Sequence, residues 1–183
     1  MITYREYCKT IKEDWGKTSP IPKEVYDYPD PLKGINWIDL GLPSGTLWAD
    51  VNVTNPLDGS PYWTWDDLMD SGYASSVPTQ EQFQELTETC RWTWDDTRKG
   101  VTAKSASGKT LFFPALGSCD GELDNIVKAG VQGYYWSADG FKGMWDEDEA
   151  YVLYFDNDTY TTPNPESKAE VACGFPARLV KKK

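Results

Sequence analysis

The pattern of apolar and polar positions predicts short strands in the first part of the chain. Residues 46–53 alternate between apolar and polar side chains, which is typical of a strand with one buried face. The apolar positions of this segment are Leu47, Ala49, Val51 and Val53. Residues 37–40 predict a shorter strand, residues 42–45 a turn, and residues 63–69 a short helix.

One segment carries a strong helix signal. Thr79 is suited to cap a helix, and Gln82 three residues later completes the pattern of a capping box. Phe83, Leu86 and Cys90 follow at helical spacing and form an apolar stripe. We therefore predict a helix near residues 79–90 with one buried face.

The second half of the chain predicts strands again. A hairpin is expected across Ser107-Gly108, with strands at 101–104 and 110–114. Central strands are predicted at 134–137 and 150–155, and a closing strand at 170–180. The side chains expected to point into the core are Tyr135, Val152, Tyr154 and Phe155. Residues 141–145, a run of large apolar residues near glycines, predict an exposed loop.

The first 33 residues differ from the rest. Residues 3–15 predict a short helix whose apolar side chains are Tyr4, Tyr7, Cys8, Ile11 and Trp15. A proline-rich connector follows, and proline is incompatible with a helix interior. We therefore expect an N-terminal helix and connector over residues 1–33 and a main domain over residues 34–183.

Composition argues against several classes of function. The net charge of the 183 residues is −11, so phosphate backbones and anionic membrane surfaces repel the chain. The apolar runs are all shorter than the ~20 residues of a membrane span. The sequence contains no histidine, which excludes Ser-His-Asp and Cys-His mechanisms and histidine-ligated metals. Residues 1–6 show no leader pattern, so no secretory signal is expected and the localisation stays open.

Several runs of sequence carry a resemblance to a known domain family. They are residues 37–48, 133–137, 150–155 and 173–180, together with the helix motif Pro78-Thr79-Gln80-Glu81-Gln82-Phe83-Gln84-Glu85-Leu86. Together they resemble a C-type-lectin-like domain of gut Bacteroidetes and Fibrobacter-type proteins, close to the formylglycine-generating-enzyme type. The variable proteins of diversity-generating retroelements use the same scaffold. The resemblance covers roughly residues 36–180.

The resemblance implies an α+β, C-type-lectin-like fold of short twisted antiparallel sheets flanked by two helices, with the first and last strands paired. It implies a binding protein rather than an enzyme, one that displays variable-type C-terminal loops to a protein or glycan receptor. Such relatives are surface proteins or phage receptor-binding proteins, and are often oligomers. In many C-type lectins a disulfide joins the elements that hold Cys90 and Cys173. Free buried thiols are expected here, because no secretory signal is visible.

Two other classes of function stay open. One is an enzyme, either formylglycine-generating-like or carbohydrate-active through paired carboxylates. The other is a structural module of a surface assembly, docked through residues 1–33. Calcium is an alternative at the acidic runs 146–149 and 156–158, because calcium prefers several oxygen ligands. Their spacing matches no EF-hand loop, so we expect solvated acidic loops and neither a metal nor another cofactor.

The segment between residues 134 and 170 holds the predicted ligand-binding site. Rigid aromatic side chains mixed with Asp, Asn and Ser are typical of binding surfaces built for recognition. The residues assigned to the site are Tyr134, Ser137, Asp139, Phe141, Lys142, Met144, Trp145, Asp146, Asn157 and Tyr160. Trp145 is the predicted anchor, with Tyr134 and Phe141 near it. No residue is assigned a catalytic role, and no partner in nucleic acid or membrane is expected.

Overall fold

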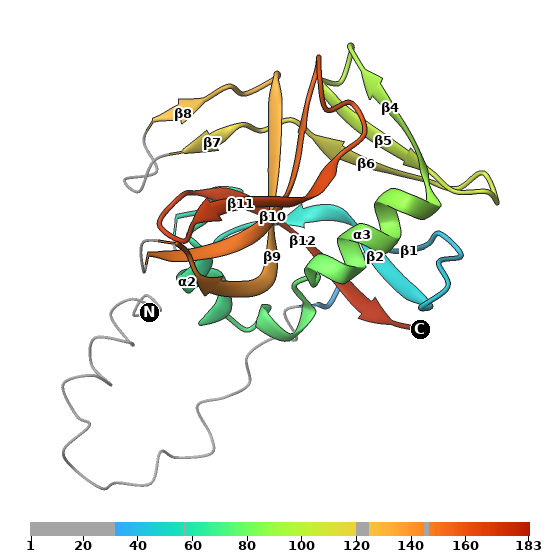
Figure 1. Cartoon of the computed structure of the whole chain (residues 1–183). Helices are drawn as coiled ribbons and strands as arrows, with labels where there is room; N and C mark the ends of the chain where they lie inside the picture. The colour runs from blue at the N-terminus through green and yellow to red at the C-terminus, as the bar shows by residue number, and fades with distance from the viewer. Residues whose placement is uncertain (1–31, 57, 120–124, 145–146) are drawn as a thin grey trace, which may run out of the picture.

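The computed structural model describes residues 32–56, 58–119, 125–144 and 147–183. In this part the chain is α+β, with mostly antiparallel strands arranged in several small sheets and few helices (Figure 1). This confirms the coarse fold class. The helix predicted over residues 3–15 lies outside the described residues.

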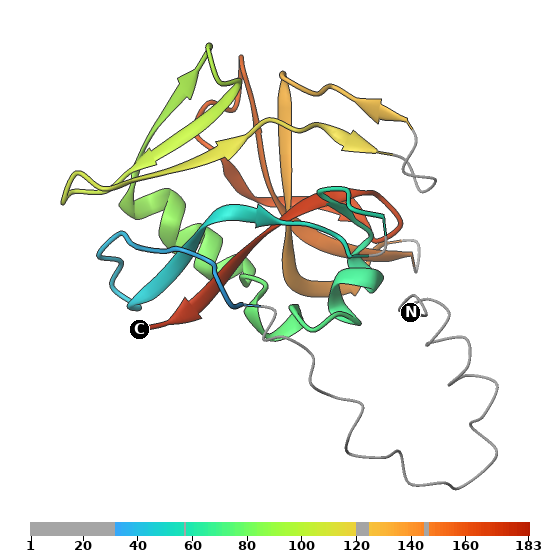
Figure 2. The same ribbon diagram turned by 180° about the vertical axis from the view of Figure 1, so that it is seen from behind.

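A four-stranded sheet joins the front and the back of the chain. Its strands lie in the order β1 (Trp37–Asp39), β2 (Thr46–Val53), β12 (Phe175–Lys182) and β3 (Tyr62–Trp63). β2 and β12 are antiparallel, with Trp48 opposite Val180, and Figure 2 shows both strands from behind. The last strand, β12, therefore pairs with the second strand, β2, while β1 pairs with β2 rather than with β12, so the expected pairing of the first and last strands is wrong in this detail.

The remaining strands of the described residues form three further antiparallel sheets. One contains β4 (Arg91–Asp95), β5 (Gly100–Lys104) and β6 (Thr110–Pro114), which confirms the predicted hairpin. A second is ordered β11 (Asn164–Glu170), β10 (Asp148–Asp156) and β9 (Gln132–Lys142). The third pairs β7 (Ser118–Cys119) with β8 (Ile126–Val127). In Figure 1 the β4–β5–β6 sheet and the β7–β8 pair lie in the upper part of the molecule.

Within the described residues, each α-helix begins with a capping side chain. The predicted capping box is present at α3 (Gln80–Thr89), where Thr79 and Gln82 satisfy each other's backbone N–H groups. The predicted stripe is also confirmed, because Phe83, Leu86 and Cys90 are buried. The short helix α2 (Trp65–Met69) is capped by Thr64, and a 3-10 turn, η2 (Ala74–Ser76), separates the helices.

The β9–β10 hairpin has a hydrophobic core on each face. Tyr135, Leu153 and Phe155 belong to one cluster of buried side chains, which also holds the apolar face of α3. Trp136 and Val152 belong to a second cluster, which holds Phe175 and the other residues at the start of β12. Alternation along a strand sends neighbouring side chains to opposite faces, so one hairpin serves both cores.

Arg178 in β12 is a positively charged residue inside the domain, with only 1% of its surface exposed. Its guanidinium donates to Asn52 Oδ1 at 2.8 Å, to Ala49 O at 3.0 Å and to Phe112 O at 2.9 Å. It also lies over the ring of Phe113. Burial lowers the pKa of Arg178, but a guanidinium stays protonated at neutral pH.

Four details of the strands differ from the sequence-based expectation. Val51 is 53% exposed and Trp48 is fully buried, because β2 packs against both cores rather than presenting one buried face. Phe141 and Lys142 lie within β9 and not in a loop. The closing strand is interrupted, because a turn over residues 171–173 separates β11 from β12. Tyr154 is only half-buried.

Candidate ligand-binding site

The structure separates the predicted ligand-binding residues into two groups at the two ends of β9. Tyr134 lies near the start of the strand, and Phe141 and Lys142 lie at its end. A strand advances about 3.3 Å per residue, so Tyr134 and Lys142 are up to roughly 26 Å apart along β9. The two groups are therefore well separated along the strand. The predicted anchor Trp145 and its neighbour Asp146 lie outside the described residues.

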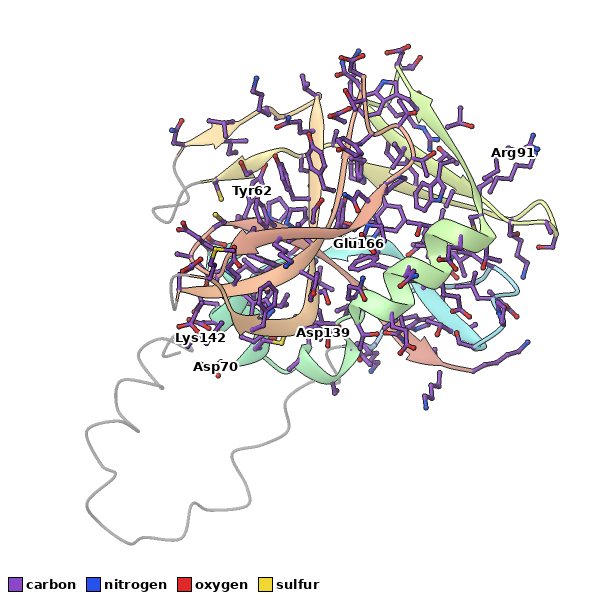
Figure 3. All side chains as sticks on the ribbon, viewed as in Figure 1. Tyr62, Asp70, Arg91, Asp139, Lys142 and Glu166 are labelled. Carbon is purple, nitrogen blue, oxygen red and sulfur yellow. The ribbon has the colours of Figure 1, made fainter. Side chains whose placement is uncertain are left out.

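The group at the end of β9 lines a shallow hollow, which we call the Trp65 hollow. It has a volume of about 330 Å³ and lies between the start of α2, the end of β9 and the start of β10. Figure 3 shows Lys142 at this edge of the molecule. The lining residues are Trp65, Asp66, Gly140, Phe141, Lys142, Asp148, Glu149 and Val171.

The Trp65 side chain is held in place by β9. Its indole N–H donates to the carbonyl oxygen of Ser137 at 2.9 Å, and its backbone N–H donates to Val171 O at 3.0 Å. The ring lies against the backbone of Gly140, where a Cβ atom would come within 2.8 Å of it. One wall of the hollow is therefore rigid before any ligand arrives, which lowers the entropic cost of binding.

A second aromatic side chain forms another part of the lining. Phe141 packs on Tyr151, with ring centroids 5.0 Å apart. The Lys168 ammonium lies 4.9 Å from the centroid of the Phe141 ring and 5.5 Å from that of Tyr151. The Phe141 ring at the end of β9 is therefore held by contacts with Tyr151 and with the Lys168 ammonium.

The rim of the hollow is charged and open to solvent. Lys142 lies opposite Asp148 in the β9–β10 pair, and their side chains form a salt bridge of 2.9 Å. Both side chains are well exposed, and exposed ion pairs are worth little in stability. Either partner is therefore available to a ligand at small cost. Met144, in the turn that follows, is 88% exposed.

Two predicted residues are used inside the protein instead. Ser137 is fully buried, so its hydroxyl faces no solvent and bonds to Asp139. The Asp139 carboxylate accepts a hydrogen bond from the backbone N–H of Gln80 at 2.6 Å, which ties β9 to the first turn of α3. Figure 3 shows Asp139 beside this end of the helix. Both side chains position β9 and lie outside the lining of the hollow.

Replacing Asp139 with Ala is therefore expected to reduce stability and not ligand binding. The change leaves an N–H group of the first helical turn without its acceptor, which typically costs about 1 kcal/mol. Chemical unfolding of the variant measures this loss. Asp139→Asn keeps an acceptor oxygen and is the control, so it is expected to recover most of the stability. Unchanged stability in the Ala variant would contradict the assignment.

The other group forms a hydrogen-bonded tyrosine cluster at the opposite end of β9 and β10. Tyr134 donates to Gln132, Gln132 donates to Tyr154, and Tyr154 donates to Asp156. Burial, then the hydrogen bond to Asp156 and its charge, raises the pKa of Tyr154. Burial alone would raise the pKa of Asp156, but hydrogen bonds from the Tyr160 and Asp158 backbone and from Tyr154 hold it below its ordinary value.

The tyrosine cluster satisfies its own polar atoms, which favours a structural role. The Tyr134 ring stacks on Phe175, with centroids 4.7 Å apart and an interplanar angle of 11°. Two predicted residues remain at its surface. Tyr160 is 42% exposed and packs its ring edge on Tyr154, and Asn157 is exposed and bonds through its backbone N–H to Val131.

Three residues at or beside the hollow were not assigned to the site: Trp65 lies outside the predicted segment 134–170, and Tyr151 and Lys168 lie within it. Alternation along residues 150–155 places Tyr151 on the same face as Leu153, so the sequence pattern indicated the face of the strand on which Tyr151 lies. No pattern in the sequence places Trp65 against β9, because the contact spans 72 residues. Lys168 lies in a strand that was not predicted.

The described cysteines and acidic residues show simple environments. Cys90 and Cys173 are free thiols and do not form the bridge considered from the resemblance, and burial raises the pKa of each. Over residues 32–56, 58–119, 125–144 and 147–183, no group of three or more Cys, Asp or Glu side chains is arranged to hold a metal ion. Within the same ranges, every helix is too short or too polar to cross a membrane.

Comparison with known proteins gives no relative for this chain. No family model, no curated protein and no solved structure matches it.

Proposed function

We propose that this chain is a non-catalytic ligand-binding protein built on a C-type-lectin-like scaffold. Three features support the scaffold: antiparallel strands in small sheets, pairing of β2 with β12 across the whole domain, and the capped helix α3 beside them. The sequence motifs of the resemblance coincide with β1, β2, α3, β9, β10 and β12. The proposed relatives are the variable proteins of diversity-generating retroelements.

The Trp65 hollow is the observation that carries the binding function. A rigid indole and a supported phenyl ring line it, charged groups surround it, and Met144 extends beside it almost fully exposed. Large apolar side chains at an exposed edge are favourable when a partner covers them. Aromatic anchors within a polar rim are also the usual anatomy of a recognition surface.

The chemistry of the hollow favours binding over catalysis. The sequence contains no histidine, so the usual general base near neutral pH is missing. Lys142 is held in a salt bridge with Asp148 at the rim of the hollow. The charged rim instead suits hydrogen bonds to a polar partner. We propose a protein or glycan receptor as that partner, contacted from a phage particle or a cell surface, with the domain acting alone or in an oligomer.

The proposal is tested by truncating two apolar side chains, Phe141 on the lining of the hollow and the exposed Met144 in the turn that follows β9. Phe141→Ala combined with Met144→Ala is expected to weaken capture on arrays of glycans and surface proteins by at least about tenfold, because interface anchors are each worth ~1–2 kcal/mol or more. The matched control is Val51→Ala with Ile126→Ala, which removes two exposed apolar side chains elsewhere. It is expected to bind as the parent protein does.

The melting temperature of each variant distinguishes binding from folding. A loss of capture in a variant that still unfolds cooperatively near the parent temperature supports the proposal. Equal loss in the control, or no specific capture by the parent on either array, contradicts it. The retroelement relationship has its own test, because it requires a reverse-transcriptase gene and a near-copy of the 3′ coding end beside this gene.

A further inference from the structure

A second hollow lies on the outer face of the β4–β5–β6 sheet, near the end of α3. It has a volume of about 300 Å³ and is lined by Thr89, Arg91, Lys104, Ser105 and Ala106. Figure 3 shows Arg91 and Lys142 on opposite sides of the molecule. This Arg91 hollow is therefore separate from the Trp65 hollow.

Two positively charged residues of the Arg91 hollow lie opposite each other in the β4–β5 pair. Arg91 in β4 lies directly opposite Lys104 in β5, and both are exposed. Like charges at directly opposed positions of an antiparallel pair are destabilising. Neither forms a salt bridge within the part of the chain that the structure describes, although the protein holds 29 acidic residues against 18 basic ones.

The nearest acidic side chain in the sequence is used elsewhere. Glu88 accepts a hydrogen bond from Gln84 at 2.9 Å, one turn back along α3. The partial negative charge at the end of α3 favours a cation nearby, which accounts for one member of the pair. It does not account for a second cation placed directly against the first.

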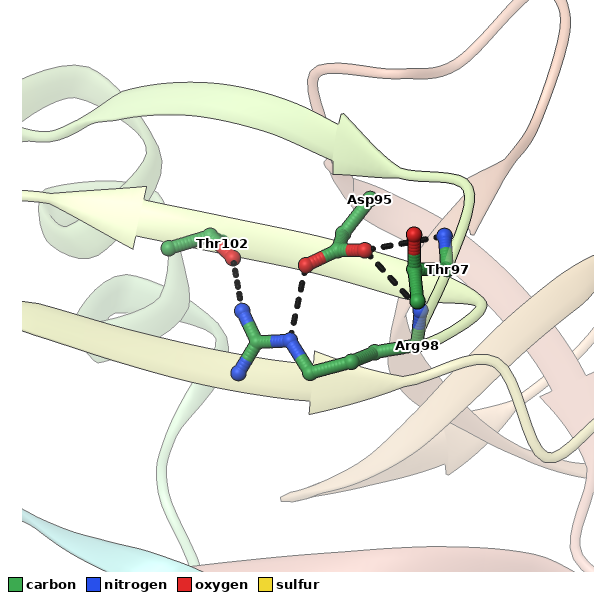
Figure 4. A network of polar contacts seen from close by, with 4 residues as sticks. All are labelled: Asp95, Thr97, Arg98 and Thr102. Carbon is green, nitrogen blue, oxygen red and sulfur yellow. Dashed lines mark hydrogen bonds and ion pairs between the residues drawn. The ribbon is translucent and has the colours of Figure 1, made fainter.

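Arg98, in the turn between β4 and β5, shows how a nearby cation is neutralised. Its guanidinium pairs with Asp95 at 2.7 Å and donates to Thr102 (Figure 4). It also lies 4.0 Å from the centroid of the Phe112 ring. Among the residues that the structure describes, no carboxylate forms such a pair with Arg91 or Lys104. An anionic ligand would supply the missing counter-charge.

We propose that the Arg91 hollow binds a phosphate or sulfate group. A guanidinium offers several N–H donors in a fixed plane, and an ammonium offers donors as a point charge, so the pair suits an anion with oxygens on several sides. The hollow is larger than a bare oxyanion, which leaves room for the molecule that carries the group. The overall charge of −11 disfavours anions in general, so binding here depends on the local charge of the basic pair.

The test titrates the full chain with inorganic phosphate and inorganic sulfate at constant ionic strength, with chloride as the replaced ion. Backbone amide NMR shifts are expected to move at residues 89–91 and 104–106. In Arg91→Gln with Lys104→Gln, the dissociation constant is expected to rise at least about tenfold. Glucose 6-phosphate and glucose 6-sulfate form the second arm, and binding tighter than that of the free ions shows a carrier in the remaining space.

Control variants separate the site from general charge. Lys33→Gln with Lys128→Gln removes the same charge from two exposed positions elsewhere and is expected to bind phosphate as the parent does. Lys104→Gln alone, in chloride, is expected to keep or raise the melting temperature, because it removes the repulsion. No shift at these amides, equal weakening in the Lys33/Lys128 control, or a destabilised Lys104 variant would overturn the proposal.

Discussion

Replacing Arg178 with Met is expected to lower the free energy of unfolding by about 3 to 5 kcal/mol. Each buried acceptor left without its donor costs roughly 1–3 kcal/mol, and the guanidinium serves Asn52, Ala49 and Phe112 at once. Met fills much of the same volume, so the loss reports the polar contacts rather than a cavity. Such a loss is a large part of the total stability of a typical domain, which is about 5–15 kcal/mol.

Chemical unfolding followed by circular dichroism measures this loss. The control is Lys181→Met, which removes a cation from the same strand, at an exposed position over the ring of Trp37. A cation–π contact at an exposed site is worth ~0.5–1 kcal/mol, so the control is expected to change stability by no more than that. Equal effects of the two substitutions would show that Arg178 acts only through net charge.

Replacing Gly133 with Ala is expected to destabilise the protein by about 3 kcal/mol or more. The added Cβ would come within 2.1 Å of the Phe155 ring, which is fully buried in the core. Phe155 stacks on Tyr135 and contacts the Trp94 ring edge, so it has no free space to move into. Overpacking a closed core typically costs ~1–3 kcal/mol, and this overlap is severe.

A second substitution identifies the cause. Phe155→Leu removes ring atoms at the point of overlap, so the double variant Gly133→Ala, Phe155→Leu is expected to be more stable than the sum of the single effects predicts. Unfolding free energies of the four proteins give the coupling. If the two effects simply add, the loss comes from the backbone of β9 and not from contact with Phe155.

Local chemistry made parts of the fold predictable from the sequence. The cap of α3 needs only Thr79 and Gln82, which are three residues apart. The helical spacing of the apolar residues that follow was enough to predict the buried face of the helix. Strand β2 was predicted with its observed bounds. Its buried positions were predicted only in part: Ala49 and Val53 are buried, but Val51 is exposed and Trp48 is buried, because alternation describes a strand with one covered face and β2 has cores on both sides.

The candidate site depended on contacts between distant residues, which periodicity does not encode. Asp139 was assigned to a ligand because it is a polar residue near glycines, yet its partner is the N–H of Gln80, 59 residues away. Gly140 suggested a loop, and its structural reason is the Trp65 ring that lies on it. The assignments of Phe141 and Lys142 stay predictions, now placed on the lining of one hollow.

Strand β9 contributes to both hydrophobic cores with its first part and to the protein surface with its last part. Its first residues up to Ser137 are fixed by two cores, while the end at Phe141 and Lys142 reaches beyond both of them. Substitutions at that end meet solvent and neighbouring surface side chains rather than closed packing, where most changes are nearly neutral. The outer end of this hairpin therefore tolerates substitutions that its interior does not.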